Sequence, residues 1–193
     1  MIIEMQDWRY EMRREIQEIV PGLFLGPYSC SKNLQDLQSK GITHMVMIRD
    51  TTEQHIMKPL FPNLFQYHIV EASDSPMQNL IPYFPKTNEY IRSVLAHGGR
   101  VFVYCNSGIS RSPTFVVAYM MESFKMAFQV AINYVQSKRF CMNPNETFKL
   151  QLREYEPIFH AREAIEQMQY TPEQVLLQGQ RRRPIDEDED EME

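Results

Sequence analysis

One segment constrains the fold of this chain more than any other: a short apolar run that ends in a cysteine, with an arginine six positions further on. Residues 101–104 form the apolar run and are typical of a buried strand, whereas the apolar residues that follow Ser112 are typical of a helix. The loop between Cys105 and Arg111 therefore joins the end of a strand to the start of a helix. Backbone amides and the positive end of the helix dipole make such a place favourable for an anion and for a cysteine thiolate.

The residues of this loop, here called the phosphate loop (residues 105–111), suit a phosphate group. Gly108 permits a tight turn, and Arg111 supplies a two-pronged donor that matches two phosphate oxygens. A cysteine after an apolar strand is more often a small buried hydrophobe, but an arginine in the first turn of a helix opposes the dipole unless an anion offsets it. We expect a phosphate site formed by the Arg111 side chain and by the amides of Asn106, Ser107, Gly108, Ile109, Ser110 and Arg111.

A second loop offers the acid that phosphoester cleavage needs. The departing alcohol oxygen must receive a proton, and Asp74 lies in a turn-rich loop directly after a candidate strand at residues 64–70. Loops at the carboxyl ends of strands in a mostly parallel sheet gather round one crevice, so this loop and the phosphate loop are expected to face the same ligand. Glu71 is the alternative acid on chemistry alone, and an ordinary turn or helix cap is the alternative role for Asp74.

Length and composition favour one soluble domain. A chain of 193 residues with 43% hydrophobic residues can bury one sizeable core, and no segment has the length of a membrane span or the pattern of a secretion signal. The three cysteines, Cys30, Cys105 and Cys141, lack the spacing of metal ligands and suit a reducing compartment in which thiols stay free. We therefore expect a cytoplasmic protein without a disulfide framework, a bound metal or a cofactor.

The net charge of −5 comes from the end of the chain. Residues 186–193 hold seven of the 25 acidic residues, and without them the chain has 20 basic and 18 acidic residues, a net charge of +2. A nearly neutral folded part argues against an extended basic surface for nucleic acid, and the acidic run is expected to be solvated and disordered. The basic residues 181–183 beside this run are a weak signal for nuclear import.

Alternating apolar runs and turn residues predict an α/β protein built in layers. Residues 9–20 fit either a short amphipathic helix or an extended lead-in. Strands are expected at residues 23–26, 42–48, 64–70 and 101–104, and helices at residues 33–40, 80–96, 113–124, 128–137 and 145–159. The helix at residues 113–124 is apolar on nearly all sides, so we expect it in the core, where it anchors the phosphate loop.

Taken together, these segments resemble the catalytic domain of the dual-specificity protein phosphatases. The motifs that carry the resemblance are the loop from Cys105 to Ser112, Asp74 with Asn79, Leu80, Tyr83 and Phe84, residues 21–26 with residues 41–43, and Pro144 and Asn145 with Gln151, Leu152, Tyr155 and Glu156. The resemblance implies a single compact monomeric domain with a central mixed sheet flanked by helices. We expect this domain at residues 15–165, after a lead-in of residues 1–14 and before a flexible tail of residues 166–193.

The resemblance is greatest to a pseudophosphatase branch of this family, and two positions bear on activity. That branch carries glycine at the position of the nucleophile, whereas this chain has Cys105, so loss of the nucleophile does not carry over. Active relatives usually have histidine directly before the cysteine, where it organises hydrogen bonds behind the loop and helps to hold the thiolate. This chain has Tyr104 there, and the bulky tyrosine is expected to leave Cys105 less readily ionised.

The residues and the resemblance support two functions. As an enzyme, the protein would bind proteins phosphorylated on Tyr, Ser or Thr, Cys105 would attack phosphorus to form a phosphocysteine, and Asp74 would protonate the leaving oxygen. The resemblance assigns Ser112 to the release of the thiolate and requires no metal. As a binding module, the protein would use the same pocket to hold a phosphoprotein or a regulatory partner with little or no turnover.

Overall fold

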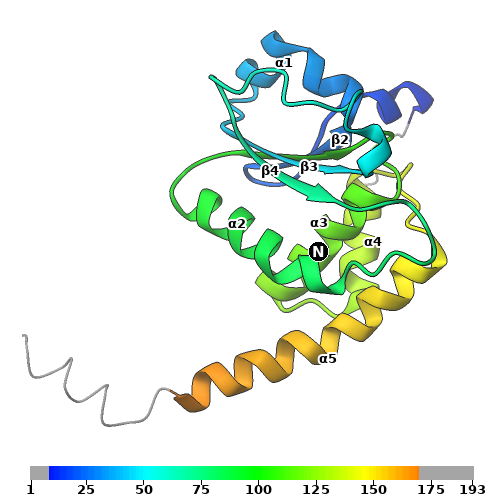
Figure 1. Ribbon diagram of the computed structural model, residues 1–193. Helices are drawn as coiled ribbons and strands as arrows, with labels where there is room; N and C mark the ends of the chain where they lie inside the picture. The colour runs from blue at the N-terminus through cyan, green and yellow to red at the C-terminus, as the bar shows by residue number, and fades with distance from the viewer. Residues whose placement is uncertain (1–8, 170–193) are drawn as a thin grey trace, which may run out of the picture. The chain divides into compact units, whose positions relative to one another are not determined.

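The computed structural model describes residues 9–169 and contains a five-stranded sheet with helices on both faces (Figure 1). The strands are β1 (Gln17–Val20), β2 (Leu23–Pro27), β3 (His44–Arg49), β4 (Gln66–Glu71) and β5 (Val101–Cys105). The α-helices are α1 (Leu34–Ser39), α2 (Phe84–Ala96), α3 (Arg111–Phe124), α4 (Phe128–Lys138) and α5 (Glu146–Gln169). Short 3-10 helices are η1 (Tyr10–Arg14), η2 (Tyr28–Lys32), η3 (Thr51–Glu53) and η4 (Ile81–Tyr83).

The sheet brings several loops to one edge. Its strand order is β1-β2-β5-β3-β4, with β2, β5, β3 and β4 parallel and β1 antiparallel to β2. In this register Pro27 lies beside Cys105 and Arg49 lies beside Glu71, so the carboxyl ends of the parallel strands share an edge. Because β5 is the central strand, the phosphate loop leaves from the middle of that edge, between the loops that follow β2 and β3.

The two faces of the sheet are covered differently. α2, α3 and α4 lie on one face and α1 on the other (Figure 1). α3 is buried from Arg111 to Glu122, as its all-round apolar pattern predicted, so the phosphate loop continues directly into the core. On the opposite face, Phe102 and Tyr104 of β5 belong to a hydrophobic cluster that includes Leu37 of α1.

The predicted α/β fold with a central mixed sheet is confirmed. One departure is α5, which runs ten residues past the predicted helix end at residue 159, and another lies at the N-terminal end. Residues 9–20 are neither one helix nor a plain lead-in, because they form η1 and then the edge strand β1. In β1, Gln17 and Ile19 are buried while Glu18 is exposed, which is the alternation of a strand with one buried face. A strand of four residues that contains Gln and Glu gives too weak an alternating pattern to be recognised in the sequence.

The chain divides into a unit of residues 1–157 and a unit of residues 158–193, with the boundary inside α5. In the second unit α5 continues to Gln169, and the ring centroids of Phe159 and His160 are 4.3 Å apart. No helix in the described part of the chain is long and apolar enough to cross a membrane. The acidic run, the basic residues 181–183 and residues 1–8 of the lead-in lie outside the described residues, and the predicted domain limits at residues 15 and 165 stay predictions.

Candidate active site

In the phosphate loop, carbonyl groups accept hydrogen bonds from the rest of the protein, whereas the backbone amides have no acceptor among the described residues. The carbonyls of Asn106, Gly108 and Ile109 accept hydrogen bonds of 2.8 to 3.2 Å from groups outside the loop. Within residues 9–169, by contrast, none of the backbone amides of residues 106–111 has a hydrogen-bond acceptor. A run of free amides between a strand end and a helix N-terminus is an arrangement that binds anions.

Gly108 has the conformation that brings the loop close to β2. Its φ is +67°, in the left-handed region that favours glycine. A Cβ atom at this position would lie 2.6 Å from the carbonyl carbon and oxygen of Gly26. Any side chain at position 108 would therefore push the phosphate loop away from β2.

Arg111 begins α3, is only 6% exposed, and is held by an acidic side chain from another loop. Its Nη1 donates to Oε2 of Glu53 at 2.6 Å and its Nη2 donates to Oε1 at 2.9 Å, while Nη1 also donates to the carbonyl of Ala72 at 3.1 Å. Burial alone would lower the pKa of Arg111, but the bonds to Glu53 and the nearby negative groups raise this pKa above its ordinary value. The hydrogen bonds from Arg111 in turn lower the pKa of Glu53. The guanidinium is thus charged and fixed in orientation.

A second edge of the Arg111 guanidinium is free. Nε is buried and has no hydrogen-bond partner among the described residues. The Nε–H and the second N–H of Nη2 form this edge and point in the same direction, because the guanidinium is planar. Two oxygens of one phosphate group can accept from such a fork, so the free edge fits the ligand that the sequence predicted.

Asp74 reaches the phosphate loop. Its Oδ1 accepts hydrogen bonds from Oγ of Ser110 at 2.7 Å and from Nδ2 of Asn145 at 3.1 Å, whereas its Oδ2 has no partner among the described residues. Glu71, the alternative acid, instead forms an ion pair with Arg49 at 3.7 Å. The structure therefore brings the loop after β4 to the phosphate loop through Asp74.

Cys105 lies at the base of the loop and is 1% exposed. The fully buried Ser112 donates a hydrogen bond from Oγ to Sγ of Cys105 at 3.2 Å. Cys105, Arg111, Asp74 and Ser112 thus gather at one loop, while their catalytic roles stay predictions. In the described part of the chain, no group of three or more His, Cys, Asp and Glu side chains is placed to hold a metal ion.

Glu53 is a contact of the site that the sequence prediction missed. Besides Arg111, it accepts a hydrogen bond from Nδ2 of Asn106 at 3.2 Å. The sequence does carry a local signal, because Asp50 and Glu53 have the spacing of a capping box and form one at the start of η3. This signal locates the turn but not its partner, because Glu53 and Arg111 are 58 positions apart in the chain.

Arg139 is the second contact that was missed. It is fully buried and donates from Nε to the carbonyl of Gly108 at 2.8 Å, from Nη2 to the carbonyl of Arg13 at 2.9 Å and from Nη1 to the carbonyl of Glu15 at 3.1 Å. Nη1 also donates to the side chain of Gln17. Arg139 therefore ties the phosphate loop to the N-terminal segment that carries η1 and β1.

Tyr104 turns away from the phosphate loop into the cluster on the α1 face. It is fully buried, its ring stacks on Phe102 at a centroid distance of 4.9 Å, and Tyr28 is stacked at 6.2 Å. Its hydroxyl makes no hydrogen bond of normal geometry to any described residue, although Ser31 lies nearby. Burial raises the pKa of Tyr104, so the phenol stays neutral. Tyr104 thus gives the loop no hydrogen bond of the kind expected from a histidine.

Comparison with known sequences identifies the family. The model of the dual specificity phosphatase catalytic domain matches residues 23–158. The human serine/threonine/tyrosine-interacting protein is 50% identical over 165 residues, which cover 84% of this chain and 74% of that protein. MAP kinase phosphatase with leucine-rich repeats protein 3 of Dictyostelium discoideum is 41% identical over 140 residues, which cover 72% of this chain and 16% of that protein.

Solved structures agree with the sequence comparison. The crystal structure of the human tyrosine phosphatase-like serine/threonine/tyrosine-interacting protein matches with a TM-score of 0.74 and 51% identity over 76% of this chain and 98% of that chain. Human DUSP28 matches with a TM-score of 0.69 and 26% identity over 75% of this chain and 95% of that chain. The chain belongs to the dual-specificity phosphatase family and is closely related to the serine/threonine/tyrosine-interacting protein.

Proposed function

We propose that this protein binds proteins phosphorylated on Tyr, Ser or Thr at the phosphate loop and hydrolyses the phosphoester through a phosphocysteine. The observation that carries this proposal is the buried, unpartnered Nε of Arg111 next to a run of free loop amides. Glu53 fixes the guanidinium before a ligand arrives. Donors that are already oriented stabilise the charge of the transition state without further reorganisation.

The reaction takes two steps at the same loop. The thiolate of Cys105 attacks phosphorus, the bond from phosphorus to the substrate oxygen breaks, and Asp74 gives its proton to the departing alcohol or phenol. A water molecule then attacks the phosphocysteine, Asp74 accepts a proton from it, and inorganic phosphate and the thiolate are released. The unpartnered Oδ2 of Asp74 suits the proton transfers, and the hydrogen bond from Ser112 to Sγ suits the departure of the thiolate.

The test is turnover of a small aryl phosphate by the purified protein under reducing conditions. Cys105→Ser is expected to abolish turnover and to keep phosphopeptide binding, because Arg111 and the amides persist while a hydroxyl is scarcely ionised. Asp74→Asn should slow hydrolysis of alkyl phosphates about 10²–10⁴-fold and that of activated aryl phosphates much less. Retained turnover in Cys105→Ser would refute the covalent mechanism, and an equal loss on both substrates would give Asp74 a structural role.

A binding module with little turnover is the second candidate function. Two observations favour it: Tyr104 makes no hydrogen bond to the phosphate loop, and a relative that is 50% identical is named as an interacting protein. In this case the parent protein would bind a phosphopeptide but leave aryl phosphates intact. Arg111→Met should abolish that binding, because it removes the fork and keeps most of the side-chain volume.

A further inference from the structure

Three hydroxyl residues of this chain stand directly before proline: Ser75, Ser112 and Thr171. Proline-directed protein kinases select such residues, because proline fixes φ and removes one backbone N–H at the position after the phosphorylated residue. Ser112 is fully buried and bonded to Sγ of Cys105, and Thr171 lies outside the described residues. Within residues 9–169, Ser75 is therefore the hydroxyl residue before proline that a kinase can reach.

Ser75 lies at the tip of the loop that joins β4 to η4 (Figure 1). Ser75 itself is half-buried, whereas Pro76 is exposed and Met77 is 92% exposed. Among the described residues, Ser75 is hydrogen-bonded only inside this loop: its Oγ accepts from the N–H of Met77 at 3.2 Å, and its carbonyl accepts from the N–H of Gln78 at 3.0 Å. A kinase can therefore take up residues 75–77 without breaking a hydrogen bond to another part of the described protein.

The two ends of this loop are fixed, so its tip stays near the phosphate loop. At the first end, the carbonyl of Ala72 accepts a hydrogen bond from Nη1 of Arg111 at 3.1 Å. At the other end, the N–H of Leu80 donates to Oε1 of Gln151 at 2.6 Å. Ser75 directly follows Asp74, the proposed acid. A group attached to Oγ of Ser75 is thus held beside the proposed active site.

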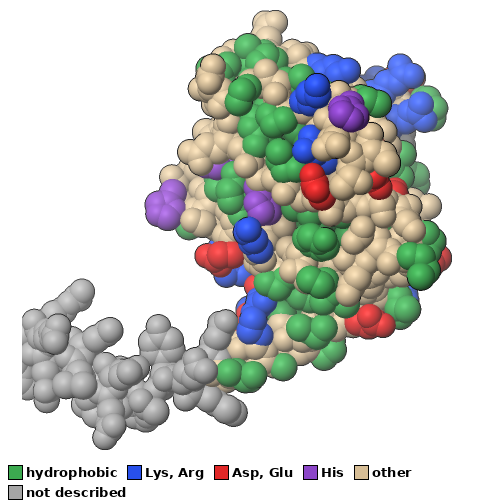
Figure 2. All heavy atoms as spheres, in the orientation of Figure 1, with side chains coloured by type: hydrophobic (Ala, Val, Ile, Leu, Met, Phe, Trp, Pro, Cys, Tyr) green, Lys and Arg blue, Asp and Glu red, His purple; other side chains and the backbone are tan. Residues whose placement is uncertain are grey.

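The charges around Ser75 do not neutralise a further anion. The carboxylate of Asp74 bonds to neutral donors and forms no ion pair with any described residue. The cation of the site, Arg111, is already paired with Glu53. Figure 2 shows Lys and Arg side chains gathered at the upper right of the molecule, above the flank on which Figure 1 draws this loop. A negative group on Ser75 would therefore add to the charge of Asp74.

We propose that Ser75 is a phosphorylation site of a proline-directed protein kinase, and that its phosphate weakens the binding of a phosphoryl group at the phosphate loop. This inference rests on the proposed function and adds a means of regulating the same site. Oγ of Ser75 attacks the γ-phosphorus of ATP, the bond from that phosphorus to the β,γ-bridging oxygen breaks, ADP leaves, and the hydroxyl proton passes to a base of the kinase. The new group carries a charge of about −1.5 to −2, which repels the equally charged phosphoryl group of a substrate.

The first measurement maps phosphorylation of the full chain by mass spectrometry after incubation with Mg-ATP and a purified cyclin-dependent or mitogen-activated protein kinase. The chain carries Cys105→Ser, so that an attached phosphate is not hydrolysed, and Thr171→Ala, so that Ser75 is the accessible residue before proline. We expect phosphate on Ser75, a strongly reduced rate in Pro76→Ala, which keeps the hydroxyl, and none on the buried Ser112. Absence of phosphate from Ser75 with both kinases would overturn the proposal and leave the proposed function standing.

The second measurement compares the affinity of the phosphorylated and unphosphorylated forms of this chain for inorganic phosphate by calorimetry. We expect phosphorylation of Ser75 to weaken binding about tenfold, equivalent to about 1.4 kcal/mol, because two phosphate groups repel each other across the site. Raising the ionic strength from about 0.05 M to about 0.5 M should shrink this difference, because salt screens exposed charges. Ser75→Ala should change the affinity by less than about twofold, because it changes no charge.

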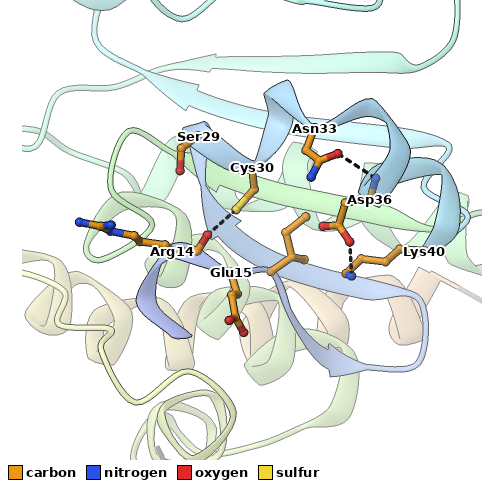
Figure 3. A pocket seen from close by; sticks show the side chains of 8 residues that line it. Arg14, Glu15, Ser29, Cys30, Asn33, Asp36 and Lys40 are labelled. Carbon is orange, nitrogen blue, oxygen red and sulfur yellow. Dashed lines mark hydrogen bonds and ion pairs between the residues drawn. The ribbon is translucent and has the colours of Figure 1, made fainter. Parts of the chain in front are cut away.

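Ser29 is the matched control, because it is an exposed serine close to the phosphate loop that is followed by Cys30 instead of proline. It lines two cavities of about 360 and 500 Å³ together with Arg14, and residues of the phosphate loop line the smaller one. Figure 3 shows Ser29 and Arg14 on the same side of the larger cavity. These kinases should therefore leave Ser29 unmodified, and Ser29→Glu, which has a cation nearby, should weaken phosphate binding less than Ser75→Glu does.

The outcomes separate the regulation from the proposed function. Equal phosphate affinity of the phosphorylated and unphosphorylated forms, or an equal loss in Ser29→Glu and Ser75→Glu, would overturn the regulation and leave the proposed function standing. Failure of the unphosphorylated protein to bind inorganic phosphate would overturn the proposed function and the regulation with it.

Discussion

At the scale of single residues, Arg111 divides its donors between the protein and the proposed ligand. The edge formed by Nη1 and Nη2 holds Glu53, and the edge that contains Nε is free. Glu53 acts through Arg111 rather than on the ligand, so it is a positioning residue. The ion pair between Arg111 and Glu53 is mostly shielded from water, so it can stabilise the folded protein. This stabilisation requires that Glu53 is ionised, so it depends on pH.

Glu53→Gln gives a pH-dependent test of this pair. The pKa of Glu53 is lowered by its hydrogen bonds from Arg111, so its stabilising effect is complete above the unfolded-state pKa of about 4.3 and is lost as the pH falls through the lower folded-state pKa. Denaturant unfolding should therefore show the largest difference between parent and variant near neutral pH, and a shrinking difference below about pH 4. A difference that stays constant from pH 7 to pH 3 would mean that the pair contributes no charge interaction.

Tyr104→His tests whether tyrosine weakens the support of the nucleophile. Histidine can offer the loop a hydrogen bond that Tyr104 does not, so alkylation of Cys105 by iodoacetamide near neutral pH should become faster and aryl phosphate turnover should rise. The smaller ring leaves the stack with Phe102 incomplete, so we expect a loss of about 1–3 kcal/mol in the free energy of unfolding.

The matched control is Tyr104→Phe, which keeps the ring and removes a hydroxyl that is buried without a partner. It should leave the alkylation rate unchanged and unfold no more readily than the parent, because an unsatisfied buried hydroxyl costs stability. If the histidine variant is destabilised without faster alkylation, Tyr104 serves the core alone.

At the scale of elements, β5, the phosphate loop and α3 form the part of the site that the sequence predicts well. Their signals are contiguous: an apolar run, a cysteine, a glycine, an arginine and an apolar helix. To predict that Asp74 lies near the phosphate loop, one further rule was needed: loops that follow parallel strands meet at one edge of the sheet. The roles of Glu53 and Arg139 could not be predicted in this way. Each contacts the site across a long stretch of chain, and no pattern among neighbouring residues indicates such a contact.

Gly108→Ala tests how tightly the loop is built onto β2. The left-handed backbone alone should cost about 1–2 kcal/mol for alanine, and the contact with Gly26 should also displace the loop. We expect lower thermal stability and loss of the stabilisation that inorganic phosphate gives the parent. Gly98→Ala is the control, since Gly98 has a φ of +76° but a Cβ there would meet no atom within 4 Å. Gly98→Ala should lower stability and keep the response to phosphate.

At the scale of the whole molecule, Arg139 joins segments that are far apart in the chain. It is 31 positions from Gly108 and 126 positions from Arg13, yet it bonds to the carbonyls of both. The sequence placed the start of the domain at residue 15, which would leave Arg13 and η1 outside it. The hydrogen bonds instead connect η1 to the phosphate loop through one buried cation, so we expect η1 to contribute to both folding and binding.

Two shortened chains, residues 9–169 and residues 15–169, test whether the domain includes η1 or starts at residue 15. The longer chain keeps every carbonyl that Arg139 binds, so its free energy of unfolding in denaturant should equal that of the full chain. The shorter chain removes the carbonyl of Arg13 from a buried guanidinium and should lose about 1–3 kcal/mol, together with part of the stabilisation by inorganic phosphate. Residues 9–169 with Arg14→Gln should stay as stable as the parent, because Cys30 binds the backbone carbonyl of residue 14 and only the side chain changes. Equal stability of the two shortened chains would place the start of the domain at residue 15 and would show that η1 does not stabilise the fold.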